Sequence, residues 1–140
     1  MQNITRISPQ EALAKMGEGY TYVDVRSEHE FSEGHPENSV NIPLANQSGS
    51  GMMANPDFIA VMKANFPAGS KIILGCGSGG RSMRAAEKLI AEGYTGLFEQ
   101  RAGWDGARNA FGAMIEPGWG RSGLPSATGA DSGAYERMKR

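Results

Sequence analysis

The sequence has very little cysteine: among 140 residues, Cys76 is the only one. An intramolecular disulfide and a cysteine-rich zinc site are therefore both excluded. Any chemistry at Cys76 has to proceed without a second cysteine in the same chain. Only two histidines are present, and no acidic cluster accompanies them, so we expect neither a metal ion nor another cofactor.

The chain also lacks an excess of positive charge and a long apolar run. With a formal net charge of −1, it has no basic surplus for a nucleic-acid backbone and no Lys/Arg block for an anionic membrane. No apolar run approaches the roughly 20 residues that span a bilayer, and Met1–Gln10 lacks a secretory pattern. We therefore expect a cytoplasmic protein with no nucleic-acid and no membrane partner.

Glycine, in contrast, is abundant, with 20 residues. This abundance predicts many tight loops, or one loop whose backbone itself binds a ligand. The hydrophobic share of 39% and the charged share of 21% are typical of a folded domain. The length fits one such domain with a short tail. Because the last residues have little to bury, we predict a domain over residues 1–125 and a flexible C-terminal tail over residues 126–140.

Short β-branched or apolar stretches alternate with stretches of helical spacing. Strands are predicted at Thr5–Ile7, Thr21–Val25, Ser39–Ile42, Lys71–Leu74 and Thr95–Phe98. Helices are predicted from Ser8 to Gly17, Ser27 to Gly34, Asn55 to Phe66, Arg81 to Glu92 and Trp104 to Phe111, with a polar loop over Ala45–Met53. The alternation predicts an α/β fold with a mostly parallel five-stranded sheet and helices on both faces.

Cys76 lies where the predicted strand Lys71–Leu74 gives way to a glycine-rich turn and then a helix. In α/β proteins, ligands bind beyond the carboxyl ends of such strands. Glycines let consecutive backbone N–H groups converge on one point, and the helix N-terminus adds its positive end. We expect these features to favour the thiolate, so that Cys76 is a nucleophile in an anion-binding loop. The residues expected to bind the substrate are Gly77, Ser78, Gly79, Gly80, Arg81 and Ser82.

Two other interpretations of this loop compete with a nucleophilic Cys76. Cys76 could pack as a small hydrophobic residue while the glycines merely form a tight turn, and the residues leave this alternative open. A nucleotide-phosphate loop would need a lysine before the Ser/Thr of G-x-x-x-x-G-K-[ST], and that pattern is absent.

The motifs around Cys76 resemble those of the rhodanese family. The run from Cys76 to Ser82 is similar to the C-x-x-G-x-R-S loop of rhodanese-domain sulfurtransferases. Upstream, four short stretches resemble the family's motifs D-V-R, E-F, G-H-I and N-I-P, in the same order. They are Val23–Arg26, Glu30–Phe31, Gly34–Pro36 and Asn41–Pro43. The resemblance covers roughly residues 5 to 111 and is greatest to the single-domain plant type called senescence-associated or dark-inducible. It implies a rhodanese-like three-layer α/β fold.

The resemblance also implies an activity, that of a thiosulfate sulfurtransferase. Cys76 would take a sulfur atom from a small anionic donor such as thiosulfate, hold it as a persulfide, and pass it to cyanide, a thiol or a sulfur-acceptor protein. The alternative is a protein-binding relay or sensor module that carries a persulfide without turnover. The physiological donor, the acceptor and the oligomeric state stay open.

Related activities on the same fold are disfavoured. The spacing from Cys76 to Arg81 is C-x4-R. This loop is one residue shorter than the C-x5-R pattern of the related phosphatases. An arsenate reductase that cycles through an internal disulfide is excluded by the single cysteine.

Four further residues are predicted to line or support the pocket: Asp24, Arg26, Arg84 and Trp104. We expect Asp24 and Arg26 chiefly to tie the end of a strand to neighbouring loops. Arg84 adds positive charge near Cys76. Trp104 follows the turn that borders the active-site mouth in the family, and packing in the core is an equal alternative for its large ring.

The chain departs from the family pattern near its end. Ala102-Gly103 stands where the family has paired glycines, and the stretch Met114–Arg121 is additional. This stretch is predicted to be either an extension of the pocket rim, with Trp119 as an aromatic wall, or an irregular surface loop.

Overall fold

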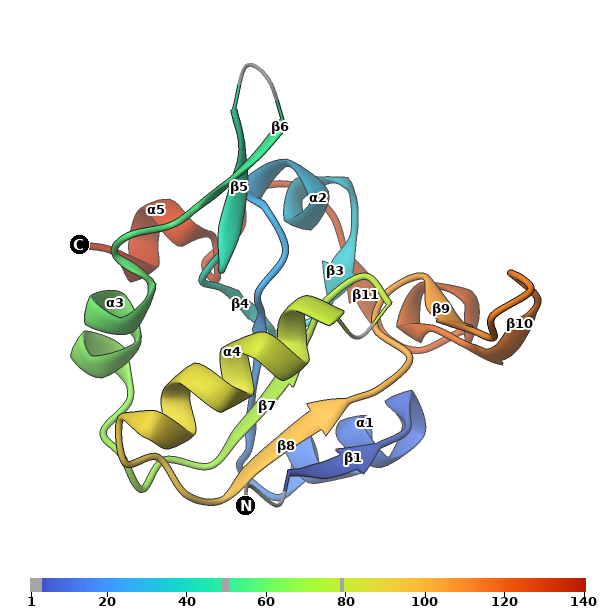
Figure 1. Cartoon of the computed structure of the whole chain (residues 1–140), viewed down its shortest axis with the longest axis horizontal. Helices are drawn as coiled ribbons and strands as arrows, with labels where there is room; N and C mark the ends of the chain where they lie inside the picture. The colour runs from blue at the N-terminus through green and yellow to red at the C-terminus, as the bar shows by residue number, and fades with distance from the viewer. Residues whose placement is uncertain (1–3, 49–50, 79) are drawn as a thin grey trace.

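The computed structural model describes residues 4–48, 51–78 and 80–140. At its centre is a five-stranded sheet in the order β1-β8-β7-β2-β4. The strands are β1 (Thr5–Ile7), β8 (Leu97–Gln100), β7 (Ile72–Gly75), β2 (Thr21–Asp24) and β4 (Val40–Asn41). All neighbouring pairs run parallel, which confirms the predicted sheet (Figure 1).

Strand β7 is the buried centre of this sheet. Ile72, Ile73 and Leu74 have no exposed surface, because helices cover both faces of the sheet and parallel strands lie on both sides. Gly75, the last residue of β7, lies opposite Asp24 in the register. A Cβ atom at Gly75 would come within 2.0 Å of the hydroxyl of Tyr22, so only glycine fits there. The end of β7, and with it Cys76, is thus packed closely against β2.

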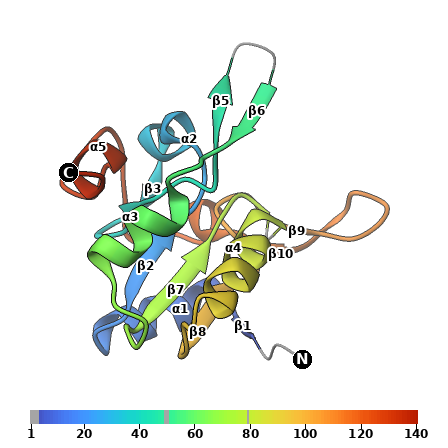
Figure 2. The same cartoon turned by 60° about the vertical axis from the view of Figure 1, so that its left-hand side comes forward.

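Helices cover both faces of the sheet (Figures 1 and 2). One face packs against α3 (Phe58–Asn65), α4 (Gly80–Ala91) and the short α5 (Tyr135–Met138), which contribute Met62, Leu89 and Tyr135 to the larger core cluster. The other face packs against α1 (Pro9–Gly17) and the 3₁₀ helix η1 (Trp119–Arg121). The helix α2 (Glu28–Glu33) follows β2 and begins with a capping box at Ser27. The predicted three-layer α/β fold is confirmed.

Three small antiparallel pairs lie outside the central sheet. They are β5 (Ala45–Ser48) with β6 (Gly51–Ala54), β9 (Gly106–Arg108) with β10 (Met114–Pro117), and β3 (His35–Pro36) with β11 (Ser126–Ala127). The segment predicted as a polar loop over Ala45–Met53 is therefore largely a hairpin. The predicted helix over Trp104–Phe111 is wrong, because Gly106 has a φ of 135°, which no helix allows, and continues into β9.

Residues 126–140, which the sequence predicts to be a flexible tail, pack onto the domain. Tyr135 is 5% exposed and belongs to the larger core cluster, and its hydroxyl accepts a hydrogen bond from Asn55 Nδ2 at 3.0 Å. The Asn41 N–H donates to the carbonyl of Gly133 at 2.7 Å. His35 Nε2 lies 2.6 Å from an Asp131 carboxylate oxygen. One buried aromatic ring and these polar contacts are enough to order a segment whose average composition is polar.

We expect Tyr135→Ala to lower the free energy of unfolding by about 3 kcal/mol, because it empties a buried aromatic site and removes the hydrogen bond to Asn55. Urea denaturation followed by far-UV circular dichroism measures the change. The matched control is Glu136→Ala, an exposed substitution in the same helix, which should change stability little. Equal unfolding midpoints for Tyr135→Ala and the control would show that the last residues do not contribute to the fold.

Candidate active site

Cys76 directly follows β7, at the carboxyl end of the central strand. Only 2% of the surface of Cys76 is exposed to solvent. The Cys76 Sγ lies 3.4 Å from the hydroxyl oxygen of Ser82, a residue in the first turn of α4. The βα position predicted for the cysteine is therefore confirmed. The sulfur lies at the base of the loop and is not openly exposed, so a reaction partner has to approach it through the loop.

The outer side of the loop is held by residues 103–105. The N–H of Trp104 donates to the carbonyl of Cys76 at 2.8 Å, and the N–H of Asp105 donates to the carbonyl of Gly77 at 2.9 Å. Because peptide units are trans and planar, the N–H groups of Gly77 and Ser78 point away from residues 103–105. Both amides therefore face the side of the loop opposite residues 103–105. Of the predicted loop residues, Gly79 lies outside the described part of the chain.

Gly103 makes this contact possible. Its φ of 65° lies in the left-handed region, and a Cβ atom there would be 2.4 Å from the carbonyl oxygens of both Cys76 and Gly77. Buried Gln100 fixes the turn: its Oε1 accepts from the N–H groups of Ala102 and Gly103 at 2.8 and 2.9 Å. The end of β8 therefore determines where the Cys76 loop lies.

The buried carboxylate of Glu99 is linked to the Cys76 sulfur through the hydroxyl group of Ser82. Ser82 Oγ donates to Glu99 Oε2 at 2.5 Å, and Arg6 Nε donates to Glu99 Oε1 at 2.7 Å. Glu99 is fully buried on β8 and lies opposite Arg6 of β1 in the register. The strand was predicted to end at Phe98, two residues before its observed end at Gln100, so Glu99 was not identified from the sequence. An acidic residue within a stretch of strand-forming residues is the signal that identifies it.

Arg81 is held by a carboxylate, and its guanidinium lies beside the loop, since a Cβ atom at Gly77 would be 3.2 Å from its Nη2. Its two terminal nitrogens donate to Glu30 at 2.6 and 3.0 Å, and Glu30 also accepts from the N–H of Ser27 at 3.0 Å. Burial acts to raise the pKa of Glu30, but the hydrogen bonds from Arg81 and Ser27 outweigh it and lower this pKa to about 2. The hydrogen bond from Arg81 to Glu30 likewise raises the pKa of Arg81. The pair ties the start of α4 to α2.

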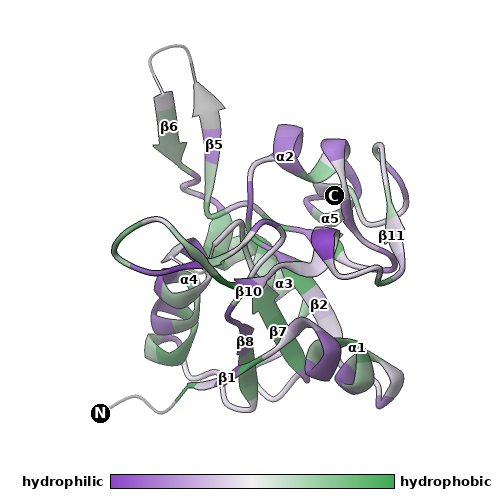
Figure 3. Ribbon diagram, turned by 90° about the vertical axis from the view of Figure 1, so that its right-hand side faces the viewer, coloured by the Kyte–Doolittle hydropathy of each residue, from purple (hydrophilic) through white to green (hydrophobic). Residues whose placement is uncertain are grey.

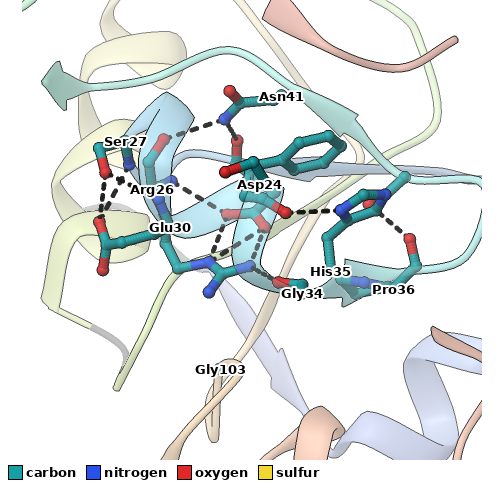
Figure 4. A network of polar contacts seen from close by, with 12 residues as sticks. Asp24, Arg26, Ser27, Glu30, Gly34, His35, Pro36, Asn41 and Gly103 are labelled. Carbon is teal, nitrogen blue, oxygen red and sulfur yellow. Dashed lines mark hydrogen bonds and ion pairs between the residues drawn. The ribbon is translucent and has the colours of Figure 1, made fainter. Parts of the chain in front are cut away.

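Asp24 and Arg26 form a buried ion pair at the end of β2, as expected (Figure 4). Arg26 Nη2 donates to Asp24 at 2.7 Å and to the carbonyl of Gly34 at 2.6 Å. Asn41 Nδ2 donates to the carbonyls of both Asp24 and Arg26 at 2.9 Å. These contacts hold the segment that leads to α2 in place and leave Asp24 and Arg26 with a supporting position beside the loop.

Trp104 covers this ion pair. The Arg26 guanidinium lies 5.2 Å from the centre of its ring. A Cβ atom at Gly34 or at Gly120 would come within 2.6 Å of the ring, so both glycines are needed for its packing. Of the two alternatives for Trp104, the structure therefore favours packing.

Two pockets flank the loop. The first, of about 490 Å³, is lined by Arg81 together with Glu30, Ala45, Met52 and Arg84. The second, of about 500 Å³, is lined by Ser78 together with Arg6, Arg101, Ala107, Arg108, Ile115 and Glu116. Arg84, predicted near the loop, is thus an exposed residue of the first pocket.

The stretch Met114–Arg121 separates into two parts. Its first part is β10, which borders the second pocket through Ile115 and Glu116. Trp119 is not an aromatic wall of the rim, as one alternative had it. It is fully buried, its ring lies edge-on to Tyr22 at 5.5 Å, and its Nε1 donates to the carbonyl of Pro125 at 2.9 Å.

Among residues 4–48, 51–78 and 80–140, His, Cys, Asp and Glu side chains form no group of three that could hold a metal ion. Over the same residues, no helix has the length and apolar character needed to cross a membrane.

Comparison with curated proteins relates this chain to plant sulfurtransferases. It is 37% identical over 108 residues to thiosulfate sulfurtransferase 16, chloroplastic, of Arabidopsis thaliana, which covers 77% of this chain and 80% of that protein. It is 41% identical over 86 residues to the senescence-associated protein DIN1 of Raphanus sativus, which covers 61% of this chain. The chain spans about half (47%) of the length of the Raphanus protein.

Among solved structures, the crystal structure of Rv0390 from M. tuberculosis is similar, with a TM-score of 0.75 and 28% identity, covering 91% of this chain and 100% of that one. The thiosulfate sulfurtransferase of Pseudomonas aeruginosa shares the fold, with a TM-score of 0.63 at 19% identity, over 91% of this chain and 20% of that one. The family model of the rhodanese-like domain matches residues 8–110, which include β2, the Cys76 loop and β8. The chain belongs to the rhodanese-like domain family.

Proposed function

We propose that this protein is a sulfurtransferase that carries sulfur as a persulfide on Cys76, with thiosulfate as the donor. The observation that carries the proposal is the position of the chain's single cysteine, between a buried central strand and a helix N-terminus, in a loop whose amides are oriented by residues 103–105. The relatives named thiosulfate sulfurtransferase support it at 37% and 32% identity.

The reaction has two displacement steps. First, the Cys76 thiolate attacks the outer sulfur of thiosulfate. A sulfur–sulfur bond forms to Cys76, the bond within thiosulfate breaks, and its electron pair leaves with sulfite. Second, a thiophilic acceptor attacks the terminal sulfur of the persulfide, and the Cys76 thiolate is restored. No outside oxidant or reductant is needed.

The surroundings of Cys76 suit anionic species at each step. The amides of Gly77 and Ser78 and the N-terminus of α4 stabilise negative charge on the sulfur. Exposed Arg84 attracts a dianionic donor to the mouth of the loop. Arg81, whose charge Glu30 largely balances, acts chiefly to position the start of α4.

A relay that holds a persulfide without turnover is the second candidate, and the 2% exposure of Cys76 favours it. Both candidates form the same sulfur adduct with thiosulfate. Only the enzyme releases that sulfur repeatedly to cyanide, so thiocyanate turnover discriminates between them.

We expect Cys76→Ser to abolish the production of thiocyanate from thiosulfate and cyanide, because a serine hydroxyl cannot carry the transferred sulfur. Colorimetric detection of thiocyanate measures the loss. Glu87→Gln, an exposed substitution on α4, is the control and should retain full activity. Unchanged turnover in Cys76→Ser would end the proposal.

Glu99→Gln should make Cys76 more reactive. Arg6 Nε donates to one oxygen of Glu99, so the oxygen of the new amide turns toward Arg6 and its NH₂ group toward Ser82. The Ser82 hydroxyl hydrogen, which Glu99 holds in the native chain, can then point at the sulfur and stabilise the thiolate. One hydrogen bond is worth about 1 kcal/mol, so we expect alkylation of Cys76 by iodoacetamide at neutral pH to be about fivefold faster.

The control for this prediction is the same substitution in a Ser82→Ala background, where the gain should disappear because no hydroxyl links Glu99 to the sulfur. Glu99 acts here as a positioning residue. An equal gain in both backgrounds would mean that Glu99 acts on Cys76 without Ser82.

Glu30→Gln tests the ion pair with Arg81 through its pH dependence. The pKa of Glu30 is lowered from its ordinary value of 4.5 to about 2, so the pair stabilises the fold above pH 4.5, and this stabilisation is lost as the pH falls toward 2. Its side chain is 33% exposed, and solvent screening limits the effect at neutral pH to about 1 kcal/mol. Urea denaturation of the variant and the native chain should therefore give curves that converge below pH 4.5. Glu33→Gln, exposed on the same helix, should show no such convergence.

A further inference from the structure

Large apolar side chains are exposed in only two places in the described part of the chain. The four side chains are Met52 (49%), Met53 (64%), Phe111 (94%) and Ile115 (66%). The two methionines lie on β6, and Phe111 and Ile115 lie on the connection between β9 and β10 and on β10 itself. Among the described residues, the large exposed apolar side chains are thus confined to two hairpins. Scattered single residues would need no explanation, but this concentration does.

Both hairpins border the Cys76 loop. Met52 lines one pocket together with Arg81, and Ile115 lines the other together with Ser78. In Figures 1 and 2 the β5–β6 hairpin projects upward and the β9–β10 hairpin projects to the right, so the two leave the molecule in different directions. The apolar side chains therefore flank the entrance to Cys76 from two sides.

Nothing within the described chain covers these hairpins. Each forms a two-stranded sheet of its own and is not paired with the central sheet. Figure 3 shows β6 as a hydrophobic strand that stands away from the core. Isolated two-stranded hairpins are only marginally stable in water. A partner that packs against them would remove their apolar side chains from water and hold them in place.

The surface between the hairpins is basic, although the whole chain has a net charge of −1. Five arginines line the two pockets, and three of them form ion pairs: Arg6 with Glu99, Arg81 with Glu30 and Arg101 with Glu116. The excess positive charge therefore comes from Arg84 and Arg108. A positive surface attracts a negative partner and speeds its encounter. It also opposes a symmetric dimer through this face, since both copies would present the same positive charge.

We propose that this twin-hairpin surface, formed by Met52, Met53, Phe111, Ile115, Arg84 and Arg108, docks an acidic, cysteine-bearing segment of a sulfur-acceptor protein. The inference rests on the proposed function, because it concerns the second displacement. The partner's thiolate attacks the terminal sulfur of the Cys76 persulfide, a new sulfur–sulfur bond forms, and the bond to Cys76 breaks. The partner leaves as a persulfide, the Cys76 thiolate is restored, and the proton of the partner's thiol passes to water.

The experiment uses two short synthetic peptides as probes. Each has a central cysteine flanked by leucines, and one carries glutamates where the other carries lysines. The protein is first loaded with thiosulfate, and mass spectrometry then follows the loss of sulfur from Cys76. We expect the glutamate peptide to accept sulfur about tenfold faster than the lysine peptide at low salt. High salt should reduce the difference, because the attraction is screened.

Variants of the hairpins separate docking from chemistry. Met53→Ser combined with Phe111→Ser, and separately Arg108→Glu, should slow transfer to the glutamate peptide about tenfold, while release of the sulfur already loaded on Cys76 to cyanide is unchanged. Arg137→Glu, exposed on α5, is the matched control for the charge reversal and should change neither rate. Equal rates for the two peptides, or equal losses with peptide and with cyanide, would overturn the docking proposal.

A binding measurement that involves no sulfur transfer distinguishes the docking proposal from the proposed sulfurtransferase activity. Fluorescence anisotropy with the glutamate peptide, its cysteine replaced by serine, should show binding to the native chain that weakens in the hairpin variants. If the native chain makes no thiocyanate but still binds this peptide, the enzyme proposal fails and the docking surface stands. If ultracentrifugation shows that the hairpins instead mediate self-association, or if they bind anionic lipid vesicles in place of the peptide, the docking proposal fails.

Discussion

The candidate site depends on one close backbone contact, that between residues 103–105 and the Cys76 loop. Two N–H groups of this segment bind the carbonyls of Cys76 and Gly77, and the approach is so close that Gly103 has no room for a side chain. Gln100 holds the turn from within the core. The direction of the loop amides is therefore set by the end of β8, a strand that is distant from the loop in sequence but adjacent to β7 in the sheet.

Two further polar contacts support the loop from other sides. The ion pair of Arg81 and Glu30 links the start of α4 to α2. Glu99 accepts a hydrogen bond from the Ser82 hydroxyl, which in turn lies next to the Cys76 sulfur. These groups are partly or fully buried, and a buried charge without a partner is costly. Each contact therefore strongly favours a single arrangement of the loop. Such pre-organisation is what a site that stabilises anionic sulfur needs, because the dipoles do not have to reorient during the reaction.

The parts of the fold that local sequence determines were predictable, and the parts that distant residues determine were not. The apolar run of β7 and the capping box at Ser27 predict their elements directly, and the glycines after Cys76 predict the loop. The partner of Arg81 is 51 residues away, so its ion pair could not be read from the loop motif. Tyr135 and Trp119 lie in polar, glycine-rich segments, and their burial follows from cavities that only the assembled sheet and helices create.

The burial of Cys76 and the exposure of the two hairpins are both consistent with the proposed transfer of sulfur to an acceptor protein. A persulfide places its reactive sulfur about 2 Å beyond Sγ, because that is the length of a sulfur–sulfur bond. In the persulfide that we propose, the outer sulfur would extend beyond Sγ, while Cys76 itself is only 2% exposed. A small acceptor needs only a narrow opening, but a thiol on a protein has to be brought to it by contacts on the surface around that opening. Under the docking proposal the hairpins supply such contacts on two sides, so that one loop both encloses the stored sulfur and delivers it to a docked partner.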